Sequence, residues 1–250
     1  MSPGLSVVIP DAFFPEMVAG DKAKHPWPYL RREVDHNWYC DRRSPWIGFL
    51  NRDEAVLLHN LALQFRGRSG IEIGCWMGWS TCHLALAGIE LDVVDPALSN
   101  PEITSSVRSS LDAAGVLGQV HLYPTSSPDG VRELARLSGV HWNFFFIDGD
   151  HNAPAPELDV RECLEHAAPD ALFVFHDLTS PDVAKALEIL WQEGWHVLLY
   201  QTMQIMGVAW RGRARPVDHT PDPSIAWSLP GHLARYPVSR GSTREERAQR

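Results

Sequence analysis

Apolar residues in the middle of the chain gather in short runs that alternate with longer amphipathic stretches. Such runs are typical of strands buried on both faces of a parallel sheet, and the stretches between them have helical periodicity. A helix is predicted over 51–65, ahead of the first run. Strands are then predicted over 71–74, 91–95, 119–123, 142–148 and 171–176, and the helices between and after them over 78–88, 101–115, 129–138, 155–167 and 181–193.

The last two apolar runs, 196–200 and 207–210, are joined by a connection too short for a helical crossover. They are expected to form an antiparallel hairpin. The whole pattern predicts an α/β fold with a doubly wound, mostly parallel, seven-stranded sheet of the Rossmann type. Ligands bind such sheets at the carboxyl ends of the strands, so functional residues are expected there.

The segments that flank this pattern differ from it in composition. Residues 1–65 are expected to form a cap rich in Trp and Pro, irregular to about residue 45, that ends in the lead-in helix. Residues 66–211 are the predicted ligand-binding domain. Residues 212–250 carry many arginines, and a basic, solvated and partly disordered tail is expected there.

Composition narrows the classes of partner. The chain has 250 residues, 44% of them hydrophobic, and a formal net charge of -9, which argues against nonspecific binding to nucleic acid. No apolar run approaches the roughly 18 residues that a membrane helix needs, and the N-terminus lacks the pattern of a signal peptide. The four cysteines form no CxxC pair. We therefore expect a cytoplasmic protein with reduced thiols that acts on a small molecule, with homo-oligomer formation left open.

The first predicted strand leads into a glycine-containing turn, Gly74 to Gly78, and then into a helix. Glycines let the backbone approach a ligand closely, and the start of a helix offers free N–H groups. Glu72 lies inside the apolar strand, where a carboxylate needs partners, so it is expected to hold the turn or to receive a ligand donor. Asp95 ends the second strand, where an acid can accept hydrogen bonds from both hydroxyls of a ribose.

The fourth and fifth strands end in reactive side chains. Asp148 ends one of them, and His176 and Asp177 end its neighbour. Because adjacent ends of parallel strands converge, these three could meet around one cation. Two carboxylates suit Mg²⁺ or Mn²⁺, whereas the imidazole shifts the preference toward Mn²⁺, Fe²⁺ or Zn²⁺, or toward no metal at all. His151, three residues after Asp148, could take a proton from a hydroxyl group near neutral pH.

From about Glu72 to Trp210 the chain resembles the class I S-adenosylmethionine-dependent methyltransferases. More narrowly, it resembles the small bacterial O-methyltransferase-like group, methyltransferase family 24-like, whose fourth strand ends in Asp-Gly-Asp-His and whose fifth ends in His-Asp. The resemblance implies S-adenosyl-L-methionine as the cofactor. The candidate cofactor contacts are Glu72, Gly74, Cys75, Trp76, Gly78, Ser80, Asp95, Ser126, Ser127 and Asp148.

Metal-dependent catechol-type members place a metal aspartate, a general base and two further ligands at the positions of Asp148, His151, His176 and Asp177. His176 departs from that pattern, since those enzymes carry a carboxylate there. The resemblance implies catalysis by His151 and, with the metal in doubt, a cation site at Asp148, His176 and Asp177. The tryptophans of the cap and first loop either form a lid over a sugar, aromatic or natural-product acceptor or attach the cap to the sheet.

The predicted function is methyl transfer to a hydroxyl group of a small molecule. Two alternatives remain open at this point. One is a noncatalytic protein that binds S-adenosylmethionine as a scaffold. The other is N-methyl transfer or a cofactor-assisted rearrangement on the same fold.

Overall fold

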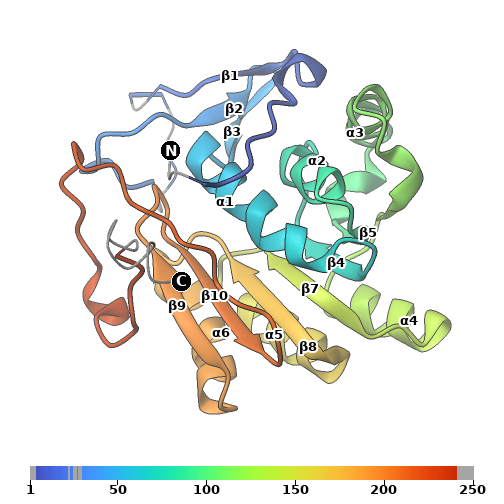
Figure 1. Ribbon diagram of the computed structural model, residues 1–250. Coiled ribbons are helices and arrows are strands. Elements are labelled where there is room, and N and C mark those ends of the chain that lie inside the picture. Colours follow the sequence, from blue (N-terminus) through green and yellow to red (C-terminus); the bar gives the residue numbers. More distant parts are fainter. Residues whose placement is uncertain (1–3, 22, 25–26, 28–29, 241–250) are drawn as a thin grey trace.

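The computed structural model describes residues 4–21, 23–24, 27 and 30–240 (Figure 1). Its centre is a seven-stranded sheet with the strand order β6-β5-β4-β7-β8-β10-β9. Among the described strands of this sheet, β10 runs opposite to all the others, so its pairings with β8 and β9 are antiparallel, which confirms the predicted fold class and the C-terminal hairpin. The strands are β4 (Ser69–Ile73), β5 (Glu90–Val94), β6 (Val120–Tyr123), β7 (Trp142–Ile147), β8 (Ala167–Phe175), β9 (His196–Tyr200) and β10 (Met206–Arg211).

Helices cover both faces of the sheet (Figure 1). The helices on one face are α1 (Arg52–Ala62), α2 (Trp79–Leu86) and α3 (Pro101–Ala113), and those on the other are α4 (Asp129–Ser138), α5 (Ala155–Glu165) and α6 (Pro181–Gln192). In β7, Phe144 and Phe146 pack toward the first group, and Phe145 and Ile147 toward the second. Strands with two covered faces need apolar residues at every position, which explains the continuous runs.

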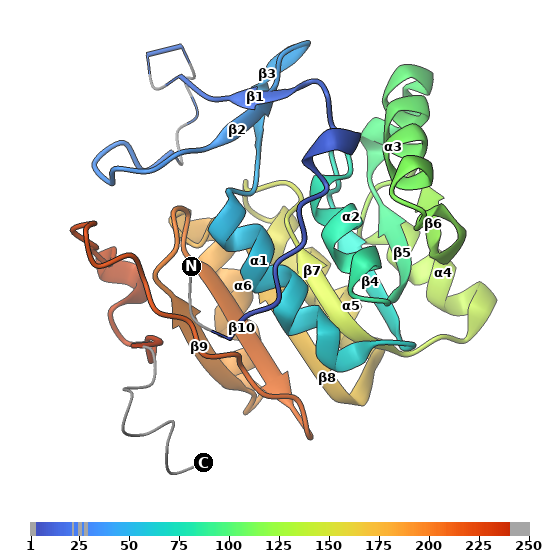
Figure 2. The same cartoon turned by 45° about the horizontal axis from the view of Figure 1, so that its top comes forward.

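Helix α1 begins with a capping box, in which Asn51 and Glu54 each bond the other's backbone N–H. Its side chains from Glu54 to Ala62 are all buried, although an amphipathic helix was predicted. The outer side is covered because the N-terminal segment runs along it, with Ser6 and Asn60 exchanging two hydrogen bonds (Figure 2). Burial on both sides leaves the polar groups of α1 to find partners inside the protein.

The N-terminal segment is less irregular than predicted. It contains β1 (Met17–Ala19), β2 (Tyr39–Asp41) and β3 (Ser44–Phe49), which form a separate three-stranded antiparallel sheet near α1 and α3 (Figure 2). Two of these strands have three residues each, too few to show alternation in a sequence. Trp38 and Trp79 are buried, so these two tryptophans attach segments to the core. The Trp46 side chain lies outside the described residues.

The chain after β10 also differs from the expectation. Residues 212–240 pack along the body of the protein, with Leu233 and Tyr236 buried and Val238 bridged to Leu199 of β9. A few buried residues thus attach this largely exposed segment to the body of the protein, and the sequence did not indicate it because widely spaced apolar residues show no periodicity. Arg244, Arg247 and Arg250 lie outside the described residues. In the part of the chain that the structure describes, no helix has the length and apolar character to cross a membrane.

Candidate active site

The carboxyl ends of β4 and β7 touch each other at the point where the strand order reverses. Gly74 has a φ of +82°, and a Cβ atom placed on it would lie 2.3 Å from the backbone oxygen of Asp148. The Asp148 N–H donates to the Ile73 carbonyl at 3.0 Å. The glycine turn and the Asp148 turn are thus in direct contact, as the position of these residues at strand ends predicts.

Asp95 organises the glycine turn. Its Oδ2 accepts hydrogen bonds from the N–H groups of Cys75 at 2.8 Å and Trp76 at 2.9 Å, and its Oδ1 accepts from Ala97 at 2.8 Å. Trp76 has a φ of +47°, a conformation that this carboxylate helps to hold. Asp95 keeps spare acceptor capacity, so its expected contact with a ribose remains a prediction.

Glu72 links β4 to the first turn of α2. The hydroxyls of Ser80 and Thr81 donate to its two oxygens at 2.5 Å and 2.6 Å. The side chain is fully buried, and burial raises the pKa of Glu72 from its ordinary value of 4.5 to about 8, although the two hydroxyls oppose that rise. Glu72 thus holds the start of the helix, in agreement with the structural role considered from the sequence.

The raised pKa of Glu72 predicts a stability that falls as the pH rises. Because the folded protein holds this proton more tightly than the unfolded chain, the stabilisation is complete below pH 4.5 and is lost as the pH rises to about 8. The free energy of unfolding should fall by roughly 1 kcal/mol per pH unit across that window, relative to Glu72→Gln. Urea unfolding of both proteins at several pH values measures this, with the exposed Glu165→Gln as the control. Parallel pH profiles for wild type and Glu72→Gln would show that Glu72 does not titrate in this way.

The start of α2 and the turn after β6 complete the predicted cofactor region. Among the described residues, no side chain caps the N-terminus of α2, which begins after Gly78. The N–H groups of that first turn can therefore serve an anionic ligand group. Ser126 is exposed and Ser127 is half-buried in the turn after β6, so both are placed at the same edge of the sheet as Asp95.

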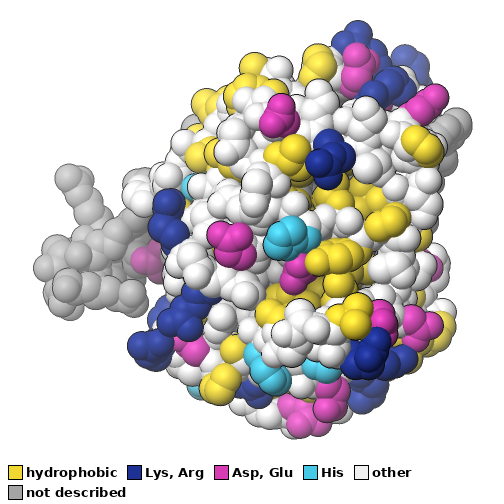
Figure 3. Space-filling view, turned by 90° about the vertical axis from the view of Figure 1, so that its right-hand side faces the viewer, with side chains coloured by type: hydrophobic (Ala, Val, Ile, Leu, Met, Phe, Trp, Pro, Cys, Tyr) yellow, Lys and Arg dark blue, Asp and Glu magenta, His cyan; other side chains and the backbone are white. Residues whose placement is uncertain are grey.

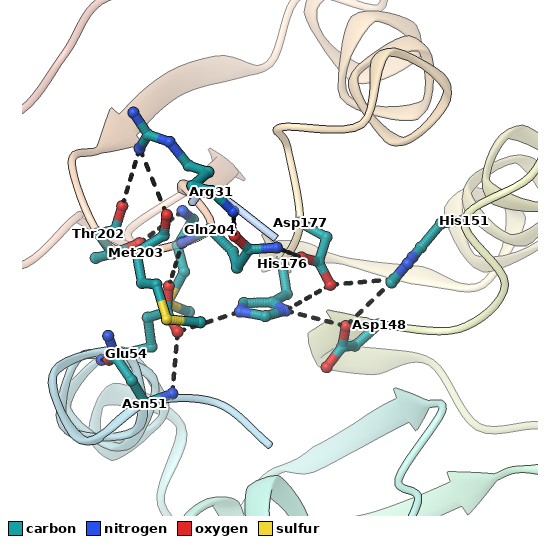
Figure 4. Close-up of polar contacts among 11 residues, drawn as sticks. Arg31, Asn51, Glu54, Asp148, His151, His176, Asp177, Thr202, Met203 and Gln204 are labelled. Atoms are coloured by element: carbon teal, nitrogen blue, oxygen red, sulfur yellow. Dashed lines mark hydrogen bonds and ion pairs between the residues drawn. The ribbon is translucent and has the colours of Figure 1, made fainter. Parts of the chain in front are cut away.

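His176 lies in a cluster of three carboxylates (Figure 4). Its Nδ1 lies 3.2 Å from Asp148 Oδ1 and 3.0 Å from Asp177 Oδ2, and its Nε2 lies 3.3 Å from Glu54 Oε2. Burial alone would lower the pKa of His176, but the three carboxylates raise it well above its ordinary value. This favours the protonated form of the ring, which is hydrogen-bonded through Nδ1 and lies within ion-pair distance of Glu54 through Nε2.

The histidines also shift the pKa values of the carboxyl groups around them. Burial by itself would raise the pKa of Asp177, yet His176 and His151 lower it strongly. Burial likewise opposes ionisation of Glu54, and the charge of His176 lowers the pKa of that carboxyl. The structure therefore holds both acids ionised in the interior, which requires such partners.

His151 lies on the open side of the two aspartates. Its Nε2 is 3.6 Å from Asp148 Oδ1 and 3.3 Å from Asp177 Oδ2, and the side chain keeps 22% of its surface exposed. Burial lowers the pKa of His151, but Asp177 and Asp148 outweigh it, so the pKa lies above its ordinary value. One ligand atom each from Asp148, His151 and Asp177 lies within 4.8 Å of the others, a spacing that could enclose a cation.

Sequence reasoning brought Asp148, His151, His176 and Asp177 together, but it missed the residues behind them. The Gln204 backbone N–H donates to Glu54 at 2.8 Å, and its side-chain amide donates to Asp177 Oδ1 at 2.7 Å. The only sequence signal at Glu54 is the capping box, which already accounts for an acid at that position. Gln204 lies in the β9–β10 connection and carries no motif.

The segments around this cluster are held by a buried arginine. The Arg31 guanidinium donates to the carbonyls of Thr202, Met203 and Ser228, and the Arg31 N–H donates to the Gln204 side chain at 3.1 Å (Figure 4). Arg31 is 4% exposed, and these carbonyls, together with the Glu33 carboxylate 3.3 Å from its Nε, are the partners of its charge. The N-terminal segment and the residues after β10 thus meet at the site.

Two non-glycine residues next to the cluster have left-handed backbones. Asp177 has a φ of +55°, and Ile205 has a φ of +60°. A β-branched residue is rare in this region, so the contacts of the β9–β10 connection must hold it there. The strain is located where Gln204 and Asp177 meet.

A family model described as a methyltransferase domain matches residues 71–178. Over this segment the chain is similar to methyltransferase domains. The match contains the glycine turn and all of Asp148, His151, His176 and Asp177, and it confirms the resemblance to class I S-adenosylmethionine-dependent methyltransferases of the O-methyltransferase-like group.

Solved structures of methyltransferases share the fold of this domain. An O-methyltransferase from Streptomyces achromogenes involved in tomaymycin synthesis, in complex with SAM, is 20% identical with a TM-score of 0.55, over 66% of this chain and 82% of that one. An O-methyltransferase from Bacillus cereus in complex with SAH is 15% identical with a TM-score of 0.56, over 65% and 83%. A precorrin-6y C5,15-methyltransferase from Geobacter metallireducens is 15% identical with a TM-score of 0.52, over 66% and 90%. Likeness at these identities concerns the fold alone.

Proposed function

We propose that the protein transfers the methyl group of S-adenosylmethionine to a hydroxyl group of a small molecule, such as a sugar, an aromatic compound or a natural product. The single observation that supports this most is the position of His151. It lies beside the carboxylates of Asp148 and Asp177, and the turn that carries Asp148 touches the glycine turn at Gly74.

The residues of the glycine turn fit the cofactor. Positive φ angles at Gly74, Trp76 and Gly78 shape a tight turn at the end of β4. The uncapped start of α2 suits the carboxylate of the methionine part, and we assign Asp95, directly after β5, to the ribose hydroxyls. When bound, the cofactor supplies an electrophilic methyl group, and the protein has to align the acceptor and exclude water.

His151 has the chemistry of a general base for a hydroxyl group. With its Nε2–H facing Asp177 and Asp148, the neutral ring has its lone pair on Nδ1, the atom that would take the acceptor's proton. The two carboxylates orient the ring and stabilise the charge that it gains. The raised pKa of His151 strengthens it as a base, provided that the pH is high enough to leave it neutral.

The surface agrees with a small acceptor. On the face drawn in Figure 3, hydrophobic side chains gather near the centre, and Lys and Arg side chains lie in separate small groups. A phosphate backbone would be met by a continuous basic stripe instead. A cavity of about 560 Å³ between the N-terminal segment and α3 reaches the glycine turn through Met77, but Asp148, His151 and Asp177 do not line it, so we give it no part in the reaction.

Isothermal titration calorimetry with S-adenosylmethionine and S-adenosylhomocysteine tests the first half of the proposal. We expect one site per chain, with binding weakened at least tenfold by Asp95→Ala. A panel of hydroxylated compounds, with release of S-adenosylhomocysteine as the readout, tests the second half. A noncatalytic scaffold would be favoured if the protein binds S-adenosylmethionine but releases no S-adenosylhomocysteine with any acceptor class. His151→Ala would then behave as wild type in every assay. Release with amines but not with hydroxyl compounds would favour N-methyl transfer.

A further inference from the structure

We propose that the imidazole ring of His176, held in place by Glu54, takes the place of a divalent cation at Asp148 and Asp177. The inference deepens the proposed function, because it concerns how the two aspartates of that site are neutralised and oriented. It is tested by cation binding to the protein alone, so its failure can be distinguished from failure of the methyl-transfer proposal.

The first step concerns the ring of His176. Both of its nitrogens face carboxylate oxygens, Nδ1 toward Asp148 and Asp177 and Nε2 toward Glu54, at 3.0 to 3.3 Å. Both nitrogens are thus already directed at carboxylate oxygens, and the group of side chains spaced to enclose a cation contains His151 in place of His176. The expected ligand set of Asp148, His176 and Asp177 therefore does not fit the structure.

The second step concerns Glu54, which keeps His176 in that state. Glu54 is fully buried, and its other contacts are the backbone N–H groups of Asn51 at 3.1 Å and Gln204 at 2.8 Å. Those amides carry no net charge. If His176 gave up its proton to bind a metal, the carboxylate would remain buried without a cationic partner, which is strongly unfavourable.

The third step concerns the remaining space near His151. Distance alone would allow a cation between Asp148, His151 and Asp177. However, the oxygens that face His151 are Asp148 Oδ1 and Asp177 Oδ2, the same two atoms that His176 Nδ1 contacts (Figure 4). A divalent ion bound to them would lie next to a fixed positive charge, and this repulsion disfavours it.

The two histidines therefore have different roles. His176 is a positioning residue, because it holds the aspartates from the buried side and reaches the acceptor only through them. His151 faces the open side, from which it would act on the acceptor. The Gln204 amide, which donates to the other oxygen of Asp177, completes this support.

Titration of the full-length protein with Mn²⁺ tests the proposal, by calorimetry and by the electron paramagnetic resonance signal of free Mn²⁺. We expect wild type to bind with a Kd weaker than about 1 mM. In Glu54→Gln/His176→Asp the built-in cation is replaced by a third carboxylate, and we expect Mn²⁺ to bind at least tenfold more tightly. Adding Asp177→Asn to that variant should abolish the gain, whereas adding Asp150→Asn should preserve it.

Two results would overturn the proposal. One is a wild-type protein that binds one Mn²⁺ with a Kd below about 100 μM and loses it in Asp177→Asn. The other is a folded double variant, as judged by circular dichroism, that gains no affinity. If the double variant does not fold, Glu54→Gln alone replaces it. This change allows His176 to lose its proton, while Gln still accepts hydrogen bonds from the backbone. Tighter binding of Mn²⁺ than in wild type supports the proposal, and unchanged binding contradicts it. Binding of S-adenosylmethionine, measured separately, reports on the proposed function.

Discussion

His151→Gln is expected to lower kcat for methyl transfer by about 100-fold or more while the affinity for S-adenosylmethionine stays within about twofold. Glutamine keeps the size and a hydrogen-bond donor toward Asp177, but it cannot accept a proton at neutral pH. General-base catalysis is therefore lost while the cofactor region around Gly74 and Asp95 is untouched. Initial rates of S-adenosylhomocysteine release, with calorimetry for the cofactor, measure both quantities.

The pH profile adds a second readout for His151. Only its neutral form accepts a proton, so the rate should rise with pH through the pKa of His151. Because the neighbouring carboxylates raise that pKa, the rise should lie at higher pH than the ordinary value of 6.5. His141→Gln, an exposed histidine before β7, is the control and should behave as wild type. A His151→Gln enzyme with an unchanged kcat and pH profile would remove His151 from the reaction.

Gly74→Ala is expected to destabilise the protein by about 3 kcal/mol or more and to abolish measurable cofactor binding. An alanine Cβ would lie 2.3 Å from the backbone oxygen of Asp148 and 2.9 Å from the Cα of Gly149. Both neighbours are backbone atoms, so the two turns must move apart. The same movement would pull Asp148 away from His151 and His176. Urea unfolding and calorimetry measure the two effects.

Gly115→Ala is the matched control for this substitution. Gly115 also has a positive φ, of +72°, but nothing lies within 4 Å of a Cβ placed there. The free energy of unfolding of Gly115→Ala should fall only by the cost of a left-handed alanine, about 1 kcal/mol, and the variant should bind the cofactor normally. Equal losses of stability for the two variants would show that the contact between the Gly74 and Asp148 turns is unimportant.

Much of the sheet could be predicted because its signals are local. A buried parallel strand needs apolar residues on both faces, so β7 is visible from Phe144 to Ile147 without any knowledge of its neighbours. The hairpin of β9 and β10 follows from the short connection between them. The three-residue strands β1 and β2 and the packed segment 212–240 give no such signal, because they are held by contacts with distant parts of the chain.

The candidate site, too, could be predicted from the sequence only in part. The alternation of strands and helices, with its glycine turn and its Asp-Gly-Asp-His and His-Asp strand ends, was enough to define the fold class and to place Asp148, His151, His176 and Asp177 at one edge. Only the tertiary structure decided that His176 faces Glu54 as well as the aspartates, which raises the pKa of His176 well above its ordinary value. The reason is physical: the charge of a buried histidine depends on which carboxylates packing brings against it, and Glu54 lies 122 positions earlier in the chain, in a helix whose own sequence signal is already explained by its cap.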